Sequence, residues 1–161
     1  MSKKSFVWVM GAACVVCIGW VATWIPGFLG GPSRTQIIQA GQSFSIPVSE
    51  VNGIPQFYPL EVAGTKMEVI AIKDSAGKVR TAFNTCQSCY ASGKGYYEAE
   101  GDKLVCQNCG VQFSAEQVGV MAGGCNPVPI FEEDKTVKNG MIYISYDYLK
   151  KATGLFQNQK R

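Results

Sequence analysis

The sequence predicts a mainly β, small α+β fold, in which an N-terminal single transmembrane helix is followed by a β-rich domain containing a zinc-ribbon-like four-cysteine hairpin. Three observations support this fold class. The chain of 161 residues begins with one long apolar run, continues with alternating β-branched segments separated by turn residues, and carries two C-x₂-C pairs next to such segments. This length suffices for one ordinary domain and an anchor.

The first element is a predicted transmembrane helix over residues 6–26. Thr23 is the only clearly polar side chain of this apolar run. A helix of this length measures roughly 30 Å, the thickness of the hydrocarbon core of a bilayer. Trp20 and Trp24 lie near its far end, where indole rings favour the membrane interface. We therefore expect an uncleaved anchor. A cleaved signal peptide, whose apolar core would be shorter, is the alternative.

The charges around this run predict its orientation. Lys3 and Lys4 lie in the short N-terminus, residues 1–5, and the apolar run itself carries no charge. Positively charged residues remain preferentially on the cytoplasmic side. We expect a single-pass protein of the cell (cytoplasmic) membrane with its N-terminus inside. A linker over residues 27–42 then leads to an extracytoplasmic domain over residues 43–161.

The β-rich domain begins with a predicted strand over residues 43–51. Phe44, Ile46 and Val48 alternate on one face of it, and Pro47 indicates the edge of a sheet because proline lacks an amide N–H. An irregular stretch rich in glycine and proline follows this strand.

The other predicted strands carry alternating or β-branched residues and are separated by turn residues. They cover residues 66–73, 78–83, 95–98, 103–105 and 141–145. The first four of them form two hairpins, each of which leads into a cysteine pair. The tail from Tyr146 carries Leu149, Ala152 and Phe156 at near-helical spacing, which predicts one short helix that caps the sheet.

Cys86, Cys89, Cys106 and Cys109 form two C-x₂-C pairs with 16 residues between them. Such a spacing lets a tight turn point two sulfurs at one ion, and Gly110 suits the positive φ that these turns often need. Zinc ribbons, mononuclear Fe(Cys)₄ centres and, with modest widening, iron–sulfur clusters share this geometry. The pattern predicts a metal site and leaves the metal open. Disulfides are the alternative, although each pair would close only a tiny loop.

A fifth cysteine, Cys125, lies in the segment G-G-C-N-P-V-P. The glycines before it and the prolines after it predict a rigid, exposed loop. We interpret Cys125 as a ligand of a polynuclear centre, a replacement ligand or a redox partner of the site. The alternative is a small loop residue without such a role.

The composition excludes several classes of function. The chain contains no histidine, which removes Ser-His-Asp and Cys-His catalysis and histidine-rich metal sites. From Ser33 onward the basic and acidic residues nearly balance, so no concentrated basic face is available for nucleic acid. We find no carboxylate pair suited to acid–base catalysis and no glycine-rich phosphate loop. The sequence thus favours an electron-transfer or metal-binding protein over an enzyme.

The cysteine-bearing part of the chain resembles the membrane iron–sulfur-containing, FtrD-like domain family. The resemblance is carried by N-T-C-Q-S-C-Y, G-Y-Y, E-G-D-K-L-V-C-Q-N-C-G and G-G-C-N-P-V-P-I, which together span residues 84–130. Members of that family are bacterial or archaeal membrane proteins, some of them associated with ferrous-iron uptake systems. The resemblance implies that Cys86, Cys89, Cys106, Cys109 and Cys125 hold iron or an iron–sulfur cluster.

Three functions follow as hypotheses. The first is electron transfer or iron handling linked to iron uptake, with membrane or periplasmic iron-uptake or redox proteins as partners. The second is a structural Zn(Cys)₄ interaction module. The third is a thiol–disulfide exchange protein, although the sequence shows no helix N-terminus or cationic neighbour that would lower a thiol pKa. Spacing alone slightly favours zinc, and the resemblance favours iron.

Overall fold

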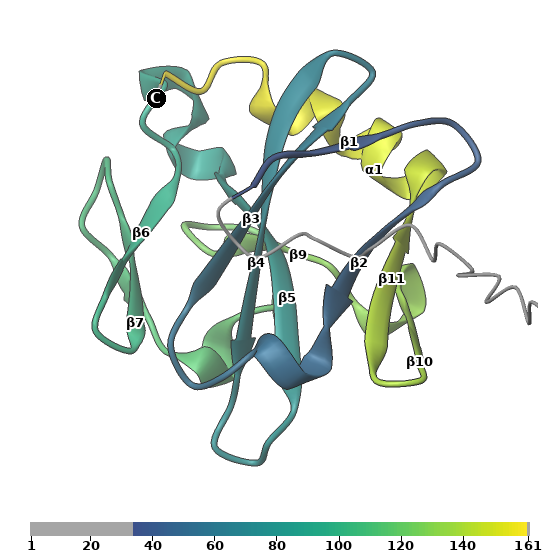
Figure 1. Ribbon diagram of the computed structural model, residues 1–161. Coiled ribbons are helices and arrows are strands. Elements are labelled where there is room, and N and C mark those ends of the chain that lie inside the picture. Colours follow the sequence, from purple (N-terminus) through teal and green to yellow (C-terminus); the bar gives the residue numbers. More distant parts are fainter. Residues whose placement is uncertain (1–33, 161) are drawn as a thin grey trace, which may run out of the picture.

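The structure, a computed structural model, describes residues 34–160. This part of the chain is mainly β with short helices, which confirms the predicted class (Figure 1). The strands are β1 (Gln36–Ile38), β2 (Ser43–Pro47), β3 (Gln56–Val62), β4 (Thr65–Lys73), β5 (Val79–Cys86), β6 (Tyr97–Glu100), β7 (Lys103–Cys106), β8 (Gln112–Phe113), β9 (Pro127–Pro129), β10 (Thr136–Lys138) and β11 (Met141–Ser145). The α-helix is α1 (Tyr146–Ala152), and 3₁₀ helices cover Val48–Glu50, Gln87–Ser92, Ala115–Gln117, Glu132–Asp134 and Thr153–Phe156.

The predicted N-terminus 1–5 and the predicted transmembrane helix 6–26 lie outside the described residues. Within residues 34–160, no helix combines the length and the apolar character that crossing a membrane requires.

A five-stranded sheet in the order β1-β3-β4-β5-β9 forms the centre of the described domain. Its neighbouring strands are antiparallel except for β1 and β3, which run parallel. The three-stranded sheet β10-β11-β2 lies on one side of it, and the sheet β6-β7-β8 lies on the other (Figure 1). The predicted hairpins of residues 66–83 and 95–105 are confirmed as β4–β5 and β6–β7.

Two hydrophobic cores fill the spaces beside the central sheet. Because side chains alternate along a strand, β4 sends Val69 and Ala71 into one core and Ile70 and Ile72 into the other. The main core contains Ile38, Phe44, Ile46, Val51, Tyr58, Leu60, Val62, Met67, Val69, Ala71, Phe83, Ile130, Ile142, Ile144, Leu149, Ala152 and Phe156. The cysteine core contains Ile70, Ile72, Ala82, Cys86, Cys89, Tyr97, Leu104, Cys106, Phe113, Ala115 and Val118.

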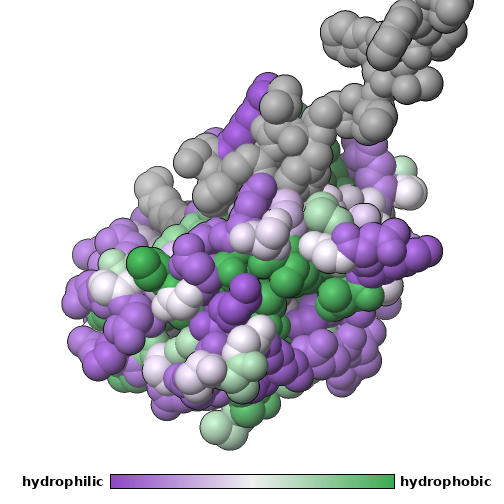
Figure 2. Space-filling model, turned by 60° about the horizontal axis from the view of Figure 1, so that its bottom comes forward, coloured by the Kyte–Doolittle hydropathy of each residue, from purple (hydrophilic) through white to green (hydrophobic). Residues whose placement is uncertain are grey.

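Hydrophilic side chains cover most of the described surface visible in Figure 2, and hydrophobic side chains occupy a smaller area between them. Three large apolar side chains are exposed in the loops that carry Cys109 and Cys125, namely Val111, Val120 and Met121.

Strand β3 is the main element that the sequence did not predict, because its proline indicated an irregular stretch. Pro59 pairs with Glu68 of β4, whereas β1 pairs only with residues 60–62 of β3. At Pro59 the strand therefore has a partner on one side only, which a residue without an amide N–H tolerates. Strand β1 lies inside the predicted linker 27–42, so part of that range joins the sheet. The boundaries of linker and domain stay predictions.

Two predicted elements, the first strand of the β-rich domain and the C-terminal helix, begin where expected but end earlier, the helix at Ala152. The strand predicted over residues 43–51 ends at Pro47 and turns into a 3₁₀ helix, and β2 is an edge strand as its proline indicated. The predicted C-terminal helix is confirmed as α1, which begins at a Ser145 cap whose hydroxyl accepts from the Tyr148 N–H at 3.3 Å.

Candidate metal centre

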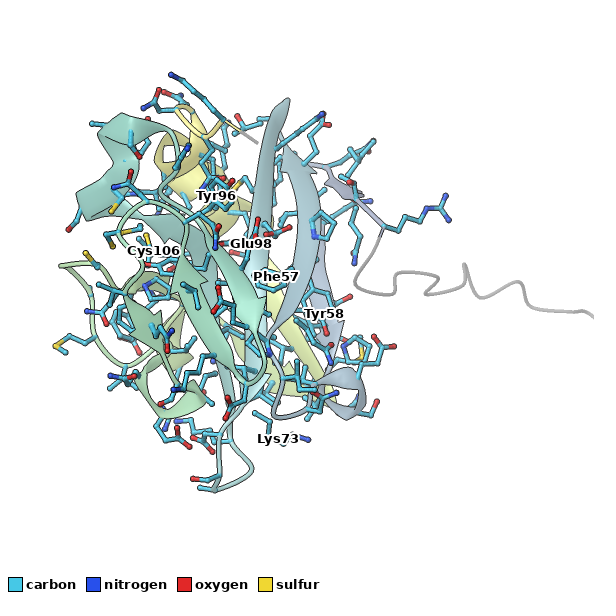
Figure 3. The ribbon with its side chains drawn as sticks, turned by 90° about the vertical axis from the view of Figure 1, so that its left-hand side faces the viewer. Phe57, Tyr58, Lys73, Tyr96, Glu98 and Cys106 are labelled. Carbon is cyan, nitrogen blue, oxygen red and sulfur yellow. The ribbon has the colours of Figure 1, made fainter. Side chains whose placement is uncertain are left out.

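The structure brings all five predicted site cysteines together. Their sulfurs form two groups, Cys86, Cys89 and Cys106 in one and Cys89, Cys109 and Cys125 in the other, and within each group the atoms all lie within 4.8 Å of one another. The first group is buried, whereas Cys109 is exposed and Cys125 is half-buried. All five are free thiols, with no disulfide among them. Figure 3 shows sulfur atoms gathered near the labelled Cys106. The cluster is a fact of the fold, and its role as a ligand set stays a prediction.

The second cysteine pair lies in a turn that points backbone amides at sulfur. The N–H groups of Asn108 and Cys109 donate to the Cys106 sulfur, and the N–H of Val111 donates to the Cys109 sulfur. Gly110 adopts a φ of 72°, as predicted, and its N–H donates to the Cys106 carbonyl at 2.9 Å. These amides stabilise negative charge on the sulfurs, which a thiolate ligand requires.

The first cysteine pair is held by close contact with Gly95. The Cys86 N–H donates to the Gly95 carbonyl at 2.8 Å, and Cys89 follows in the 3₁₀ helix Gln87–Ser92. A Cβ atom on Gly95 would lie 2.6 Å from the Cys86 carbonyl oxygen and 3.0 Å from the Cys89 carbonyl carbon. The absence of a side chain at Gly95 therefore lets the first turn pack against the β6–β7 hairpin.

We expect Gly95→Ala to displace the first cysteine turn. The added methyl group meets backbone on two sides, so the domain should lose about 1–3 kcal/mol of unfolding free energy and part of its metal affinity. Chemical denaturation and metal titration of the variant measure both. Gly154→Ala is the matched control, because a Cβ there meets nothing within 4 Å. Equal behaviour of the two variants would contradict the role of Gly95.

A buried amide joins the cysteine hairpin to the central sheet. Asn84 of β5 is fully buried, and its side chain accepts from the Tyr97 N–H at 2.7 Å and donates to the Tyr97 carbonyl at 3.0 Å. The same amide also donates to the Glu68 carboxylate of β4. Asn84 thus connects β4, β5 and β6 two residues before the first cysteine of the cluster.

The loop that carries Cys125 is tied to the first cysteine turn and to strand β6. The Tyr97 hydroxyl donates to the Cys125 carbonyl, and the Ser88 hydroxyl donates to the Gly124 carbonyl at 2.6 Å. The Tyr97 ring packs edge-on against Phe113 with centroids 5.8 Å apart, as expected for aromatic packing over a hairpin. Burial raises the pKa of the Tyr97 hydroxyl, so this group remains a proton donor at neutral pH.

The thiols differ in acidity according to their position. The Val111 N–H lowers the pKa of Cys109 to about 7. Burial raises the pKa of Cys89 and of Cys106, and the neighbouring Cys109 thiol raises the pKa of Cys125. Cys109 is therefore the most acidic of these four thiols, and it is also the exposed one. Sequence reasoning found no sign of a lowered thiol pKa, because the donor is a backbone amide.

We expect Cys109 to react fastest of these four cysteines in the reduced, metal-free chain. Only the thiolate is nucleophilic, so its alkylation rate should fall as pH drops below about 7 and should exceed that of Cys89 and Cys106 by at least about tenfold at neutral pH. Timed iodoacetamide labelling followed by peptide mass spectrometry measures each rate. Metal loading should protect Cys109. Earlier labelling of Cys89 or Cys106 would contradict this ranking.

The C-terminal tail also contributes to the site. Two residues that follow α1 contact the first cysteine turn and its neighbours. The Leu155 carbonyl accepts from the Thr85 hydroxyl at 3.1 Å, and the Asn158 side chain donates to the Tyr90 carbonyl at 2.7 Å. Sequence reasoning assigned this tail only to capping the sheet, and it missed Asn84, Asn108 and Gly95 as supports of the site. The one signal in the sequence that could have identified a support of the site was Asn84, a polar side chain inside a buried strand.

Fold and site define a small β-rich domain whose cysteine cluster is able to hold a metal. The profile of a family described as "Membrane iron-sulfur containing protein FtrD-like" matches residues 52–156, which is more than half of the chain. The chain belongs to this FtrD-like family of membrane iron–sulfur containing proteins, as the sequence motifs predicted. Searches of curated proteins and of solved structures found no match.

Proposed function

We propose that this chain is a membrane-anchored, extracytoplasmic protein that holds a cysteine-ligated iron or iron–sulfur centre and transfers electrons or handles iron. The observation that carries this proposal is the convergence of five cysteine sulfurs from three separate segments. The family description supports a membrane-associated, iron-related role. The predicted single-pass anchor would hold the domain at the outer surface of the cell membrane.

The donor set fits such a centre. The Cys89 and Cys106 sulfurs lie 3.8 Å apart, and the Cys109 and Cys125 sulfurs lie 3.7 Å apart. Ligands at metal–sulfur distances of about 2.3 Å in a tetrahedron have this spacing of about 3.8 Å. All donors are sulfur, which suits iron in thiolate or iron–sulfur form.

Bound iron would supply a reversible one-electron change, and the chain supplies the surroundings. The amides at Cys106 and Cys109 stabilise the negative charge of the sulfurs, and hydrogen bonds to sulfur tune the reduction potential. Tyr97 and the cysteine core exclude water from the inner sulfurs. Cys109 remains exposed, and this edge offers a short distance to a redox partner.

The proposed partners are membrane or periplasmic iron-uptake or redox proteins. The exposed apolar side chains Val111, Val120 and Met121 belong to the loops around the exposed edge. Apolar side chains beside an accessible redox site favour transient contact with another protein. Nucleic acid is not among the proposed partners, because the domain lacks a basic excess.

The two other functions each have one observation in their favour. The amide-to-sulfur turn at Cys106 suits a structural zinc site, but such sites are closed, and here a fifth sulfur and an exposed one join the cluster. The acidic Cys109 thiol beside Cys125 suits thiol–disulfide exchange. Neither accounts for all five cysteines.

A potentiometric titration tests the proposal. Full-length chain, purified anaerobically in detergent, is followed by absorption and electron paramagnetic resonance while the potential is stepped. We expect a reversible one-electron transition, shifted in Cys125→Ser and unchanged in the control Cys14→Ser. A chain that holds metal but shows no redox transition would overturn the electron-transfer proposal.

A further inference from the structure

The two sulfur groups share one member, Cys89. Its sulfur lies within 4.8 Å of the Cys86 and Cys106 sulfurs and equally within 4.8 Å of the Cys109 and Cys125 sulfurs. Cys89 is buried at the junction between the inner pair and the outer pair, in the 3₁₀ helix that follows β5. The Asn108 side-chain amide contacts its sulfur and links it to the second cysteine turn.

A single tetrahedral ion needs a different arrangement. It requires four sulfurs that all lie about 3.8 Å from one another. Among the described residues the sulfurs group as two triads and not as a quartet within 4.8 Å. Two triangles with a common corner are the arrangement of two ions that share one thiolate, because a thiolate sulfur has more than one lone pair to donate.

Charge favours the same arrangement. Five thiolates around one divalent ion leave three negative charges uncompensated, whereas two divalent ions leave only one. Uncompensated charge in a largely buried site is costly. Backbone amides at the Cys106 and Cys109 sulfurs offset part of this charge, and a second divalent ion offsets more of it.

We propose that Cys89 is a bridging thiolate in a binuclear centre. Cys86 and Cys106 complete the inner ion's protein ligands, and Cys109 and Cys125 complete those of the outer ion. This proposal rests on the proposed function only in taking the five cysteines as ligands. Binding two divalent ions displaces the thiol protons and involves no electron transfer. A non-protein ligand fills the remaining position of each ion.

Cobalt titration tests the bridge. Full-length Cys14→Ser/Cys17→Ser chain, in which only the five site cysteines remain, is stripped of metal and titrated anaerobically with Co²⁺ in detergent. The high-spin Co²⁺ resonance should rise to one equivalent and lose most of its intensity by the second, because a shared sulfur couples the two spins. Metal analysis should give two ions per chain.

Two variants assign the effect to named sulfurs. In Cys125→Ser the outer ion is lost, so the signal should rise to one equivalent and remain. In Cys89→Ser the spin coupling should vanish. Should these variants fold poorly by circular dichroism, the parent chain loaded with ¹¹³Cd suffices: two resonances split by mutual coupling are expected, and one unsplit resonance would overturn the bridge.

Saturation at one Co²⁺ with undiminished signal would also overturn the proposal, as would two ions whose signals simply add. The outcome is separable from that of the proposed function. A chain that binds one uncoupled Co²⁺ yet holds redox-active native iron refutes the bridge alone. A chain that binds two coupled Co²⁺ but shows no redox transition with its native metal refutes electron transfer alone.

Discussion

Cys106→Ser is expected to lower the metal content and to loosen the cysteine core while the main core stays folded. Cys106 is 1% exposed at the end of β7, and its sulfur accepts hydrogen bonds from two backbone amides. Where metal ligands belong to a core, the free energy of metal binding contributes directly to the stability of that core. This contribution amounts to about 10–16 kcal/mol in small zinc domains. Three cysteines are members of the cysteine core, and none belongs to the main core.

Hydrogen exchange measures this difference within one molecule. Amides of β6 and β7 should lose most of their protection in Cys106→Ser, whereas those of β11 and α1 should keep it. Cys125→Ser is the comparison variant: it also removes a ligand, but Cys125 lies only partly buried beside the cysteine core, so β6 and β7 should keep more protection than in Cys106→Ser. Uniform loss of protection through both cores, or full metal retention in Cys106→Ser, would contradict the prediction.

Asn84→Leu is expected to destabilise the described domain by about 2–4 kcal/mol. Leucine keeps the approximate volume of asparagine but leaves the Tyr97 N–H and carbonyl without their partner. Buried polar groups without partners cost far more than the average hydrogen bond contributes. The Glu68 carboxylate loses a donor as well. Because the hydrogen bonds between Asn84 and Tyr97 hold β6 against β5, metal affinity should fall together with stability.

Chemical denaturation of the metal-free and the loaded chain measures both effects. Asn52→Leu is the matched control, because Asn52 is exposed and its side chain only accepts from the Ile54 N–H at 2.8 Å. The control should lose about 0.5 kcal/mol or less. If Asn84→Leu loses no more unfolding free energy than the control, the Asn84 hydrogen bonds do not support the site.

Sequence patterns predicted the elements whose local chemistry agrees with their place in the fold. The β-branched run of β4, its turn and β5 were recognisable because local preference and tertiary role coincide. Strand β3 was missed since Pro59 is tolerated only where β1 has not yet begun to pair. That condition depends on a strand more than 20 residues away, which local patterns do not contain.

The candidate site was predicted in its members and not in its arrangement. Spacing identified the two cysteine pairs, and the glycine- and proline-rich surroundings singled out Cys125. Which sulfurs lie together depends on how the β6–β7 hairpin docks against β5, and Asn84 and Gly95 set that docking. The shared position of Cys89 and the exposure of Cys109 therefore became visible only in three dimensions.

Metal analysis combined with an absorption spectrum tests the central claim most directly. Full-length chain is purified anaerobically from its membrane and measured before and after reduction with dithionite. We predict bound iron with visible thiolate-to-iron charge-transfer bands that bleach on reduction and return on reoxidation. Stoichiometric zinc in a chain without visible absorbance would contradict an iron or iron–sulfur centre at these five cysteines.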